Sequence, residues 1–277
     1  MAEFSGHLSL VAAARATDGR TILAAQAFRA PFHLSKPYWD VEAGTLLVQV
    51  VNPTAGILAG DRLVSEISVQ AGAALLVTTP SASRVFKMQA GAAEGRQHFA
   101  VAAGAWLEVM PEPLVPHRGS RFRQVTTVDV EPGGSLLFVE TLLPGRIGHG
   151  EAWGWERLQL ELTVRLGSEL ILRERFDHTG ASLRALAELS GSGADACFAN
   201  ALLIVPDCDP DVPPPWRAEL HALQQAGLWI GVSTLRRGGW SLKLVATGTV
   251  QLRQTLRDVR EILAPHFPRL RCDPRKL

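Results

Sequence analysis

A short pattern recurs four times along the first two-thirds of the chain, and it constrains the fold more than any other feature. In each copy an alternating polar and apolar stretch leads to a glycine turn, and a hydrophobic stretch follows. The four glycines are 32, 29 and 34 residues apart, at Gly72, Gly104, Gly133 and Gly167. A period of this length is typical of repeated supersecondary units that bury apolar faces against their neighbours. The repeat therefore predicts stacked units built from the strands around each glycine.

The stretches beside the glycines have the period of a β-strand. From Arg157 to Val164, apolar side chains alternate with polar ones, as in a half-buried strand. Two strands around a glycine turn make a β-hairpin or a β-arch. The pattern predicts a mainly β fold of stacked β-hairpin or β-helicoid layers. The expected strands are 8–14, 21–28, 46–51, 62–69, 73–79, 98–101, 106–110, 122–130, 135–141, 157–164, 170–176, 198–205, 229–234 and 241–246.

A few peripheral helices are expected in the C-terminal third. Apolar residues recur at helical spacing over residues 182–189, 216–225 and 251–263. The run Pro213-Pro214-Pro215 is a stiff, extended connector. We expect one domain over residues 1–277, with a β-layered core of about 1–205 and a peripheral α/β segment of about 206–277.

Composition excludes several classes of protein. The 277 residues are 47% hydrophobic and 20% charged, with a net charge of +1, so the chain is globular and has no electrostatic reason to bind nucleic acid or an anionic membrane. No run approaches 18 apolar residues, and three scattered cysteines do not form a disulfide framework. We expect a cytoplasmic protein. The positive mean hydropathy and the apolar Leu228-Trp229-Ile230 and last helix suggest a partner surface in the C-terminal part.

Recognisable enzymatic signatures are missing. The chain has no GxxxxGK[ST], HExxH, CxxC or GxSxG motif, and its eight histidines occur singly. We therefore assign no catalytic residue and favour a scaffold or binding protein. Catalytic triads assemble from distant residues, so this reasoning leaves an enzyme open.

Two glycine-containing loops stand out. In the first, Gly56 and Gly60 precede Asp61, which suggests a tight loop that aims a carboxylate; an ordinary turn closed by an Asx hydrogen bond is equally open. In the second, Gly145, Gly148 and Gly150 make a flexible loop that carries Arg146 and Glu151. We expect these two charged side chains to pair and staple the loop.

Two further acids share a position in the repeat. Glu140 and Glu174 each lie seven residues after their repeat glycine. Strands in a sheet are about 4.8 Å apart, so equivalent positions fall in one row and the two acids can line one face. Solvated edge charges are the alternative. Because Glu140 ends the apolar run Leu136–Val139, we expect it to be semi-buried and to pair or to meet a cation.

At these residues the chain resembles the urease accessory protein UreD family, called UreH in some lineages. The matching pieces come in the family's order and spacing, and are Gly56–Leu63, Thr78–Lys87, Leu107–Pro113 and Glu140–Glu151. The resemblance runs from about Phe28 to the C-terminus. Three features depart from the family pattern: Ala55 replaces a glycine, Arg84-Val85-Phe86 stands for Lys-Val-Tyr, and the tail Pro274–Leu277 lacks an aromatic residue.

The resemblance implies a non-catalytic maturation factor with a β-helicoid fold. Such a protein binds apo-urease together with UreF and the GTPase UreG and helps to insert nickel into urease. Family members have been proposed to pass nickel through an internal polar tunnel, which in this chain maps onto Asp61, Ser83, Glu140 and Glu174. No tightly bound cofactor is implied, and Ni²⁺ would bind only transiently, because oxygen ligands hold it weakly.

Two other functions compete with this interpretation. A β-solenoid polysaccharide lyase or hydrolase would use Asp61, Glu140 or Glu174 as acid and base. It predicts an aromatic-lined groove, for which one tyrosine and seven scattered tryptophans are poor support. The other alternative is a plain protein-interaction module without a metal role.

Overall fold

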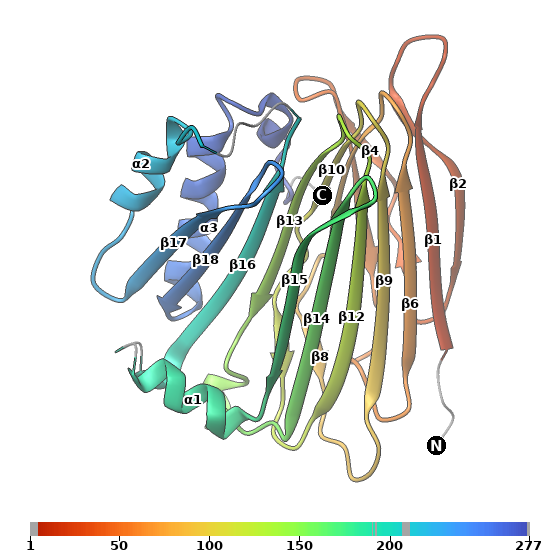
Figure 1. Cartoon of the computed structure of the whole chain (residues 1–277). Coiled ribbons are helices and arrows are strands. Elements are labelled where there is room, and N and C mark those ends of the chain that lie inside the picture. The colour runs from red at the N-terminus through yellow and green to blue at the C-terminus, as the bar shows by residue number, and fades with distance from the viewer. Residues whose placement is uncertain (1–4, 190, 192, 207–210, 276–277) are drawn as a thin grey trace.

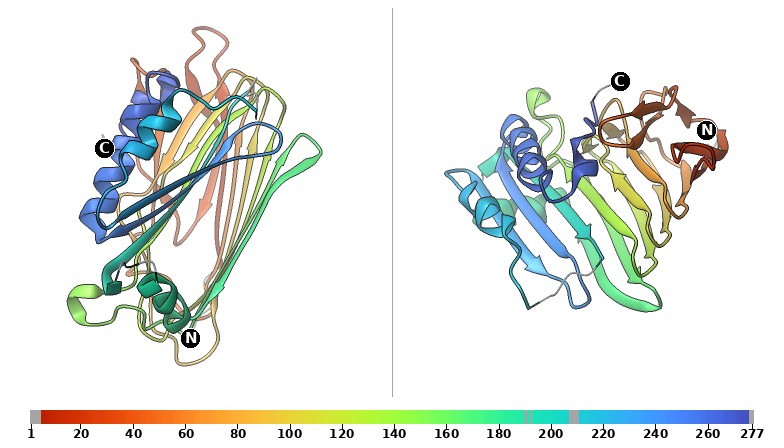
Figure 2. Two further views of the ribbon diagram at one scale, coloured as in Figure 1. Left: turned by 60° about the vertical axis from the view of Figure 1, so that its left-hand side comes forward. Right: turned by 90° about the horizontal axis from the view of Figure 1, so that it is seen from above.

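Two β-sheets lie face to face and make up most of the protein, with helices against one side and one end (Figures 1 and 2). A computed structural model describes residues 5–189, 191, 193–206 and 211–275. The mainly β class and the β-solenoid-like stacking confirm the fold expected from the repeat.

The first sheet has seven strands. In spatial order they are β15 (Glu169–His178), β14 (Arg157–Leu166), β12 (Arg121–Val130), β9 (Ala93–Val101), β6 (Arg62–Val69), β1 (Ser5–Ala14) and β2 (Thr21–Arg29).

The second sheet has eleven strands. Its main path is β17 (Leu228–Thr234), β18 (Trp240–Thr247), β16 (Ala196–Ile204), β13 (Ser135–Leu142), β10 (Trp106–Val109), β7 (Ala74–Thr78), β5 (Thr45–Val51) and β3 (His33–Leu34). Three short strands branch from it: β4 (Tyr38–Asp40), β8 (Ser83–Val85) and β11 (Leu114–Pro116).

The repeat glycines mark the crossings between the two sheets. At Gly72, Gly104 and Gly133 the chain leaves a strand of the seven-stranded sheet and enters a strand of the eleven-stranded sheet. The chain winds through the two sheets in the same direction each time. Consequently β6, β9, β12 and β14 pair in parallel, as do β7, β10 and β13. All three glycines have a positive φ, a conformation that a side chain disfavours. These three turns are β-arches.

The fourth glycine ends the coil. Gly167 joins β14 to β15, which pair antiparallel within the seven-stranded sheet. This turn is a β-hairpin, so the fourth copy shares the sequence pattern of the others without their crossing.

Two apolar cores lie on either face of the eleven-stranded sheet. Between the sheets, alternate side chains of both layers pack together, among them Leu75, Leu107 and Phe138. On the outer face, helices α2 (Trp216–Ala222) and α3 (Thr249–Leu263) cover the β13, β16, β17 and β18 region. Helix α1 (Gly180–Leu189) packs at one end, and three short 3₁₀ helices complete the elements: Ile147–His149, Gly193–Asp195 and Pro268–Arg271.

The C-terminal segment is integrated into the second sheet. Strands β17 and β18 extend that sheet beyond β16. Leu228 and Ile230 are buried in the core under α2 and α3, so this chain itself covers them and they do not contribute to the partner surface expected in the C-terminal part. Cys197 and Cys272 are buried, and Cys208 lies outside the described residues. Within the described ranges, no helix has the length and apolar character needed to cross a bilayer.

Candidate functional site

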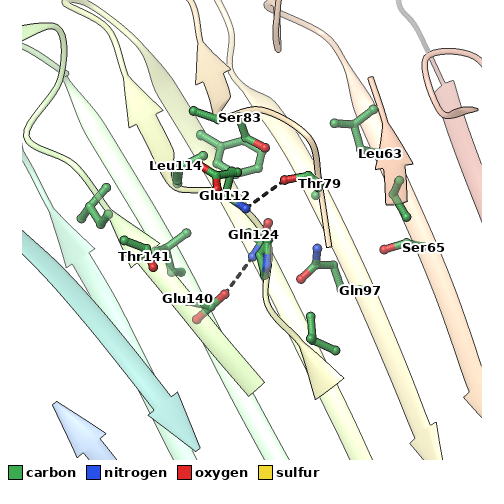
Figure 3. A pocket seen from close by; sticks show the side chains of 18 of the residues that line it. Leu63, Ser65, Thr79, Ser83, Gln97, Glu112, Leu114, Gln124, Glu140 and Thr141 are labelled. Carbon is green, nitrogen blue, oxygen red and sulfur yellow. Dashed lines mark hydrogen bonds between the residues drawn. The ribbon is translucent and has the colours of Figure 1, made fainter. Parts of the chain in front are cut away.

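The two sheets enclose a cavity of about 820 Å³. Apolar side chains of both sheets form much of its wall, including Phe99, Phe122 and Phe138. Polar side chains from strands of both sheets interrupt this wall, and Figure 3 labels several of them. They include Ser65, Gln97, Gln124, Glu140, Thr141, Glu174, Asn200 and Lys243.

One hydrogen-bonded chain crosses the cavity between the sheets. Gln124 of β12 donates through Nε2 to Oε1 of Glu140 on β13, at 3.1 Å (Figure 3). On the seven-stranded side, the Thr126 hydroxyl donates to Oε1 of Gln97 at 3.1 Å. The amide of Gln124 therefore links Glu140 to a row of neutral polar groups on the opposite sheet.

Among the described residues, no lysine or arginine forms an ion pair with Glu140. The Lys243 ammonium group, whose charge acts on Glu140 from a distance, pairs with Glu174 instead. Burial raises the pKa of Glu140 to about 7, and the negative charge of Glu174 adds to the effect, while Lys243 and the Gln124 hydrogen bond oppose it. The sequence correctly predicted a semi-buried acid, but its protein partner is a neutral amide. Near neutral pH the carboxyl group exists in both protonation states.

Glu174 forms the second link across the cavity. Its carboxylate accepts hydrogen bonds from the Lys243 ammonium group at 2.5 Å and from the Asn200 amide at 2.7 Å. Glu140, Asn200 and Lys243 are direct cross-strand neighbours on β13, β16 and β18. Glu174 therefore reaches from β15 to the same row that carries Glu140.

The two acids come together for a different reason from the one predicted. We expected Glu140 and Glu174 in one row of one sheet, but β13 and β15 belong to opposite sheets. The hairpin at Gly167 keeps β15 in the seven-stranded sheet, so Glu174 faces Glu140 across the interior. The residues that sequence reasoning missed, Gln124, Asn200 and Lys243, carry no motif. Only the pairing of distant strands brings them to the cavity.

The other two predicted path residues lie in different surroundings. Ser83 of β8 lines the cavity. Asp61 is buried outside the cavity lining, and its Oδ2 accepts the Leu58 N–H at 2.8 Å while its own N–H donates to the Leu58 carbonyl. The Asp61 carboxylate therefore closes the turn of its own loop, as the alternative of an ordinary turn expected, but it does so through the N–H three residues before it and not through the Asx hydrogen bond. Asp61 holds the loop that borders the cavity at Ala55, Gly56 and Ile57.

In each motif, one glycine occupies a position where a side chain does not fit. At Gly56, which has a φ of +154°, an added Cβ would lie 2.5 Å from the Arg84 carbonyl oxygen. At Gly145, with a φ of +122°, it would lie 2.7 Å from the Glu151 carbonyl oxygen. Gly60 and Gly150 have positive φ angles, of +86° and +66°, which favour glycine through the backbone alone.

The predicted staple of the second loop is confirmed. Arg146 donates to both carboxylate oxygens of Glu151, at 2.8 to 3.0 Å. This bidentate pair lowers the pKa of Glu151. Arg146 is thereby engaged within its own loop.

The cavity does not resemble a tight metal centre. No group of three or more histidine, cysteine, aspartate or glutamate side chains is placed to hold an ion in the described part of the chain. The donors at the cavity are carboxylate, amide and hydroxyl oxygens, which bind divalent transition metals more weakly than sulfur or imidazole. This chemistry suits passage of a cation better than its storage.

Comparison with known proteins identifies the family. The sequence profile described as "UreD urease accessory protein" matches residues 5–276. The chain belongs to the UreD urease accessory protein family. A curated "Urease accessory protein UreD" from Opitutus terrae is 62% identical over 275 residues, which cover 99% of this chain and all of that protein.

More distant members match a shorter stretch. The UreD of Yersinia enterocolitica is 35% identical over 215 residues, covering 73% of this chain and 65% of its own length. That of Yersinia pseudotuberculosis is 36% identical over 209 residues, with 73% and 64% covered. Membership of the UreD family supports a role in urease maturation. The word accessory in the family name supports a non-catalytic role.

Proposed function

We propose that this protein helps to load nickel into urease by letting Ni²⁺ pass through the cavity between its two sheets. One observation carries the proposal: Glu140 is a cavity-lining carboxylate whose hydrogen-bond partner is a neutral amide, and it forms no ion pair with a lysine or arginine of the described residues. Buried charges in proteins are ordinarily paired. A carboxylate without an ion pair of its own in the wall of a cavity is suited to receive a cation from outside.

The two carboxylates would act in sequence. Ionised Glu140 offsets part of the cost of removing water from Ni²⁺, and the oxygens of Gln124 and Thr141 supply neutral ligands nearby. Glu174 is engaged by Lys243, so a cation reaching it competes with an ammonium group. This competition weakens binding there and favours release.

The partners proposed are apo-urease, UreF and the GTPase UreG. In this arrangement the present chain acts as a scaffold in the cytoplasm and another member of the complex hydrolyses the nucleotide. The family name supports work with urease, and the absence of a phosphate-binding motif in the sequence fits the assignment of the GTPase to another chain.

The test is the nickel content of urease matured with Glu140→Leu, Glu174→Leu and the double variant. We expect less nickel with each variant, while pull-down with UreF and UreG is unchanged because the side chains face the interior. Glu161→Leu is a matched control. Glu161 is on β14 of the seven-stranded sheet, which also carries Glu174, but it is absent from the cavity lining and pairs with Arg123. Normal nickel loading by all three cavity variants would refute the conduit and leave a scaffold.

A further inference from the structure

The wall of the large cavity is rich in phenylalanine. A hydrated metal ion gains little from contact with such rings, whereas an organic molecule buries apolar surface against them. The volume of about 820 Å³ also lies within the range of about 300–1,000 Å³ that is typical of small-molecule sites. The cavity therefore has the size and the surface of a site for an organic ligand. Six of the ten phenylalanines in the chain line it: Phe32, Phe99, Phe122, Phe138, Phe176 and Phe198.

Polar side chains of the eleven-stranded sheet divide this wall into two apolar ends. Glu140 lies between Phe138 and Leu142 on one face of β13, because alternate residues of a strand point the same way. The neighbours on β16 repeat this order, with Asn200 opposite Glu140 and Phe198 opposite Leu142. One apolar end therefore begins at Phe138, and the other begins at Leu142 and Phe198.

The seven-stranded sheet contributes two more rings to the second of these ends. Phe122 of β12 and Phe176 of β15 line the cavity. Both pack in one apolar cluster with Leu142 and Phe198. We call these four residues the aromatic end of the cavity.

The aromatic end lies next to residues that are open to solvent. Ile57 belongs to the same apolar cluster. Thr54 and Ala55, which come just before it in the chain, are exposed and also line the cavity. The aromatic end is therefore accessible from outside the protein.

The charges at the cavity favour a cationic ligand over an anionic one. Lys243 and Arg175, two bases of the lining, each pair with an acid, and Arg84 is exposed to solvent. Glu140 forms no ion pair with a lysine or arginine in the part of the chain that the structure describes. An ammonium group can therefore bind Glu140 without displacing a charge, whereas an anion would meet the negative charges of Glu140 and Glu174.

We propose that the cavity binds an organic ammonium compound, with its cationic head at Glu140 and its apolar part in the aromatic end. The head donates charge-assisted hydrogen bonds to the carboxylate. The apolar part leaves water and packs against the rings, which also attract a nearby cation through their faces. This inference goes beyond the function proposed above and does not depend on the passage of nickel.

The experiment is isothermal titration of the purified full-length chain with octylammonium at pH 8. Octanol and octyl sulfate have the same chain with a neutral and an anionic head, so they separate the two parts of the ligand. We expect octylammonium to bind at least about tenfold more tightly than octanol, because hydrogen bonds to charged groups are the stronger ones. Each methylene group removed, down to butylammonium, should weaken binding by about fourfold.

Three variants assign these two contributions to residues. Glu140→Gln should lower the affinity for octylammonium by about tenfold and leave that for octanol unchanged, because only the charge is lost. Phe176→Ala should weaken the binding of both ligands, because it removes a ring from the aromatic end. Glu161→Gln is the matched control and should bind as the parent does, since Glu161 is absent from the cavity lining and pairs with Arg123.

Three results would overturn the proposal. They are no binding of octylammonium to the parent, equal affinity for the three head groups, and a preference for octylammonium that survives Glu140→Gln. Urea unfolding of each variant distinguishes lost binding from a lost fold, and if Phe176→Ala is unstable, Glu140→Gln carries the test. The titration contains no nickel, so its failure and a failure of nickel loading into urease are independent results.

Discussion

Replacing Glu140 by glutamine should stabilise the protein at alkaline pH. The amide is close to the carboxylate in size, and its oxygen still accepts the hydrogen bond from Gln124. What the substitution removes is the charge, which is buried and lies near the like charge of Glu174. A neutral amide pays no cost for a buried charge and is not repelled by Glu174. The gain in stability therefore appears only at pH values where the parent carboxyl group is ionised.

The magnitude follows from the pKa. Burial raises the pKa of Glu140 from 4.5 to about 7, so between these values the folded state holds a proton that the unfolded state has lost. The parent therefore loses stability as pH rises through this window. At about 1.4 kcal/mol for each pH unit, the ionised side chain costs the folded state about 3 kcal/mol at pH 8. Glu140→Gln should be nearly neutral at pH 4.5 and stabilising by about this amount at pH 8.

Urea unfolding followed by tryptophan fluorescence from pH 4.5 to 8.5 measures this difference. Glu188→Gln, at an exposed acid of α1 that pairs with Arg184, is the control and should change stability by less than about 0.5 kcal/mol at any pH. Glu174→Gln should make the pH-dependent loss of stability smaller and end it at a lower pH, because it removes a charge that raises the Glu140 pKa in the folded state. A Glu140→Gln effect that does not vary with pH, or a destabilised variant at pH 8, refutes the reasoning.

Two further substitutions test the scaffold around the cavity. Gly56→Ala should destabilise by about 1–3 kcal/mol in urea unfolding, because its Cβ meets the Arg84 carbonyl oxygen and its φ is positive; Gly148→Ala, with open space around it, should be close to neutral, and equal effects would contradict the steric argument. Glu108→Ala should cost about 3–5 kcal/mol, because it leaves the buried Arg260 without its ion-pair partner; a loss below about 1 kcal/mol in the same unfolding assay would show that Arg260 is satisfied by the carbonyls of Leu270 and Cys272 alone.

The local periodicity was enough to predict the layered fold but not the course of the chain between layers. Alternation located the long strands, and the glycine spacing predicted the stack, whereas the two- and three-residue strands β3, β4, β8 and β11 are too short to show a period and were missed. Whether a glycine turn closes a hairpin or an arch depends on which sheet receives the next strand, and Gly133 and Gly167 have the same local signature. Only the long-range pairing distinguishes them: β12 to β13 crosses between sheets, and β14 to β15 stays within one.

The candidate site, like the fold, was predictable only in part. An acid at the end of an apolar run identified Glu140, and the Arg146–Glu151 pair followed from opposite charges five residues apart. The roles of Asp61 and of the C-terminal apolar run depend on packing that the sequence pattern does not contain. Asp61 closes its own loop, and Leu228 is covered by one helix that precedes it in the chain and one that follows it.

A prediction of the cavity requires both the local sequence pattern and the long-range pairing of the strands. Two apolar sheets in contact would pack into a continuous core, as they do around Leu75 and Leu107. The gap persists where polar side chains on both sheets oppose one another, because Gln124, Glu140 and Glu174 reach partners across the interior and cannot be replaced there by close apolar packing. The same contacts that keep the sheets apart leave Glu140 with a neutral amide partner and no ion pair among the described residues, so one arrangement of side chains produces both the space and the charge that the proposed cation path requires.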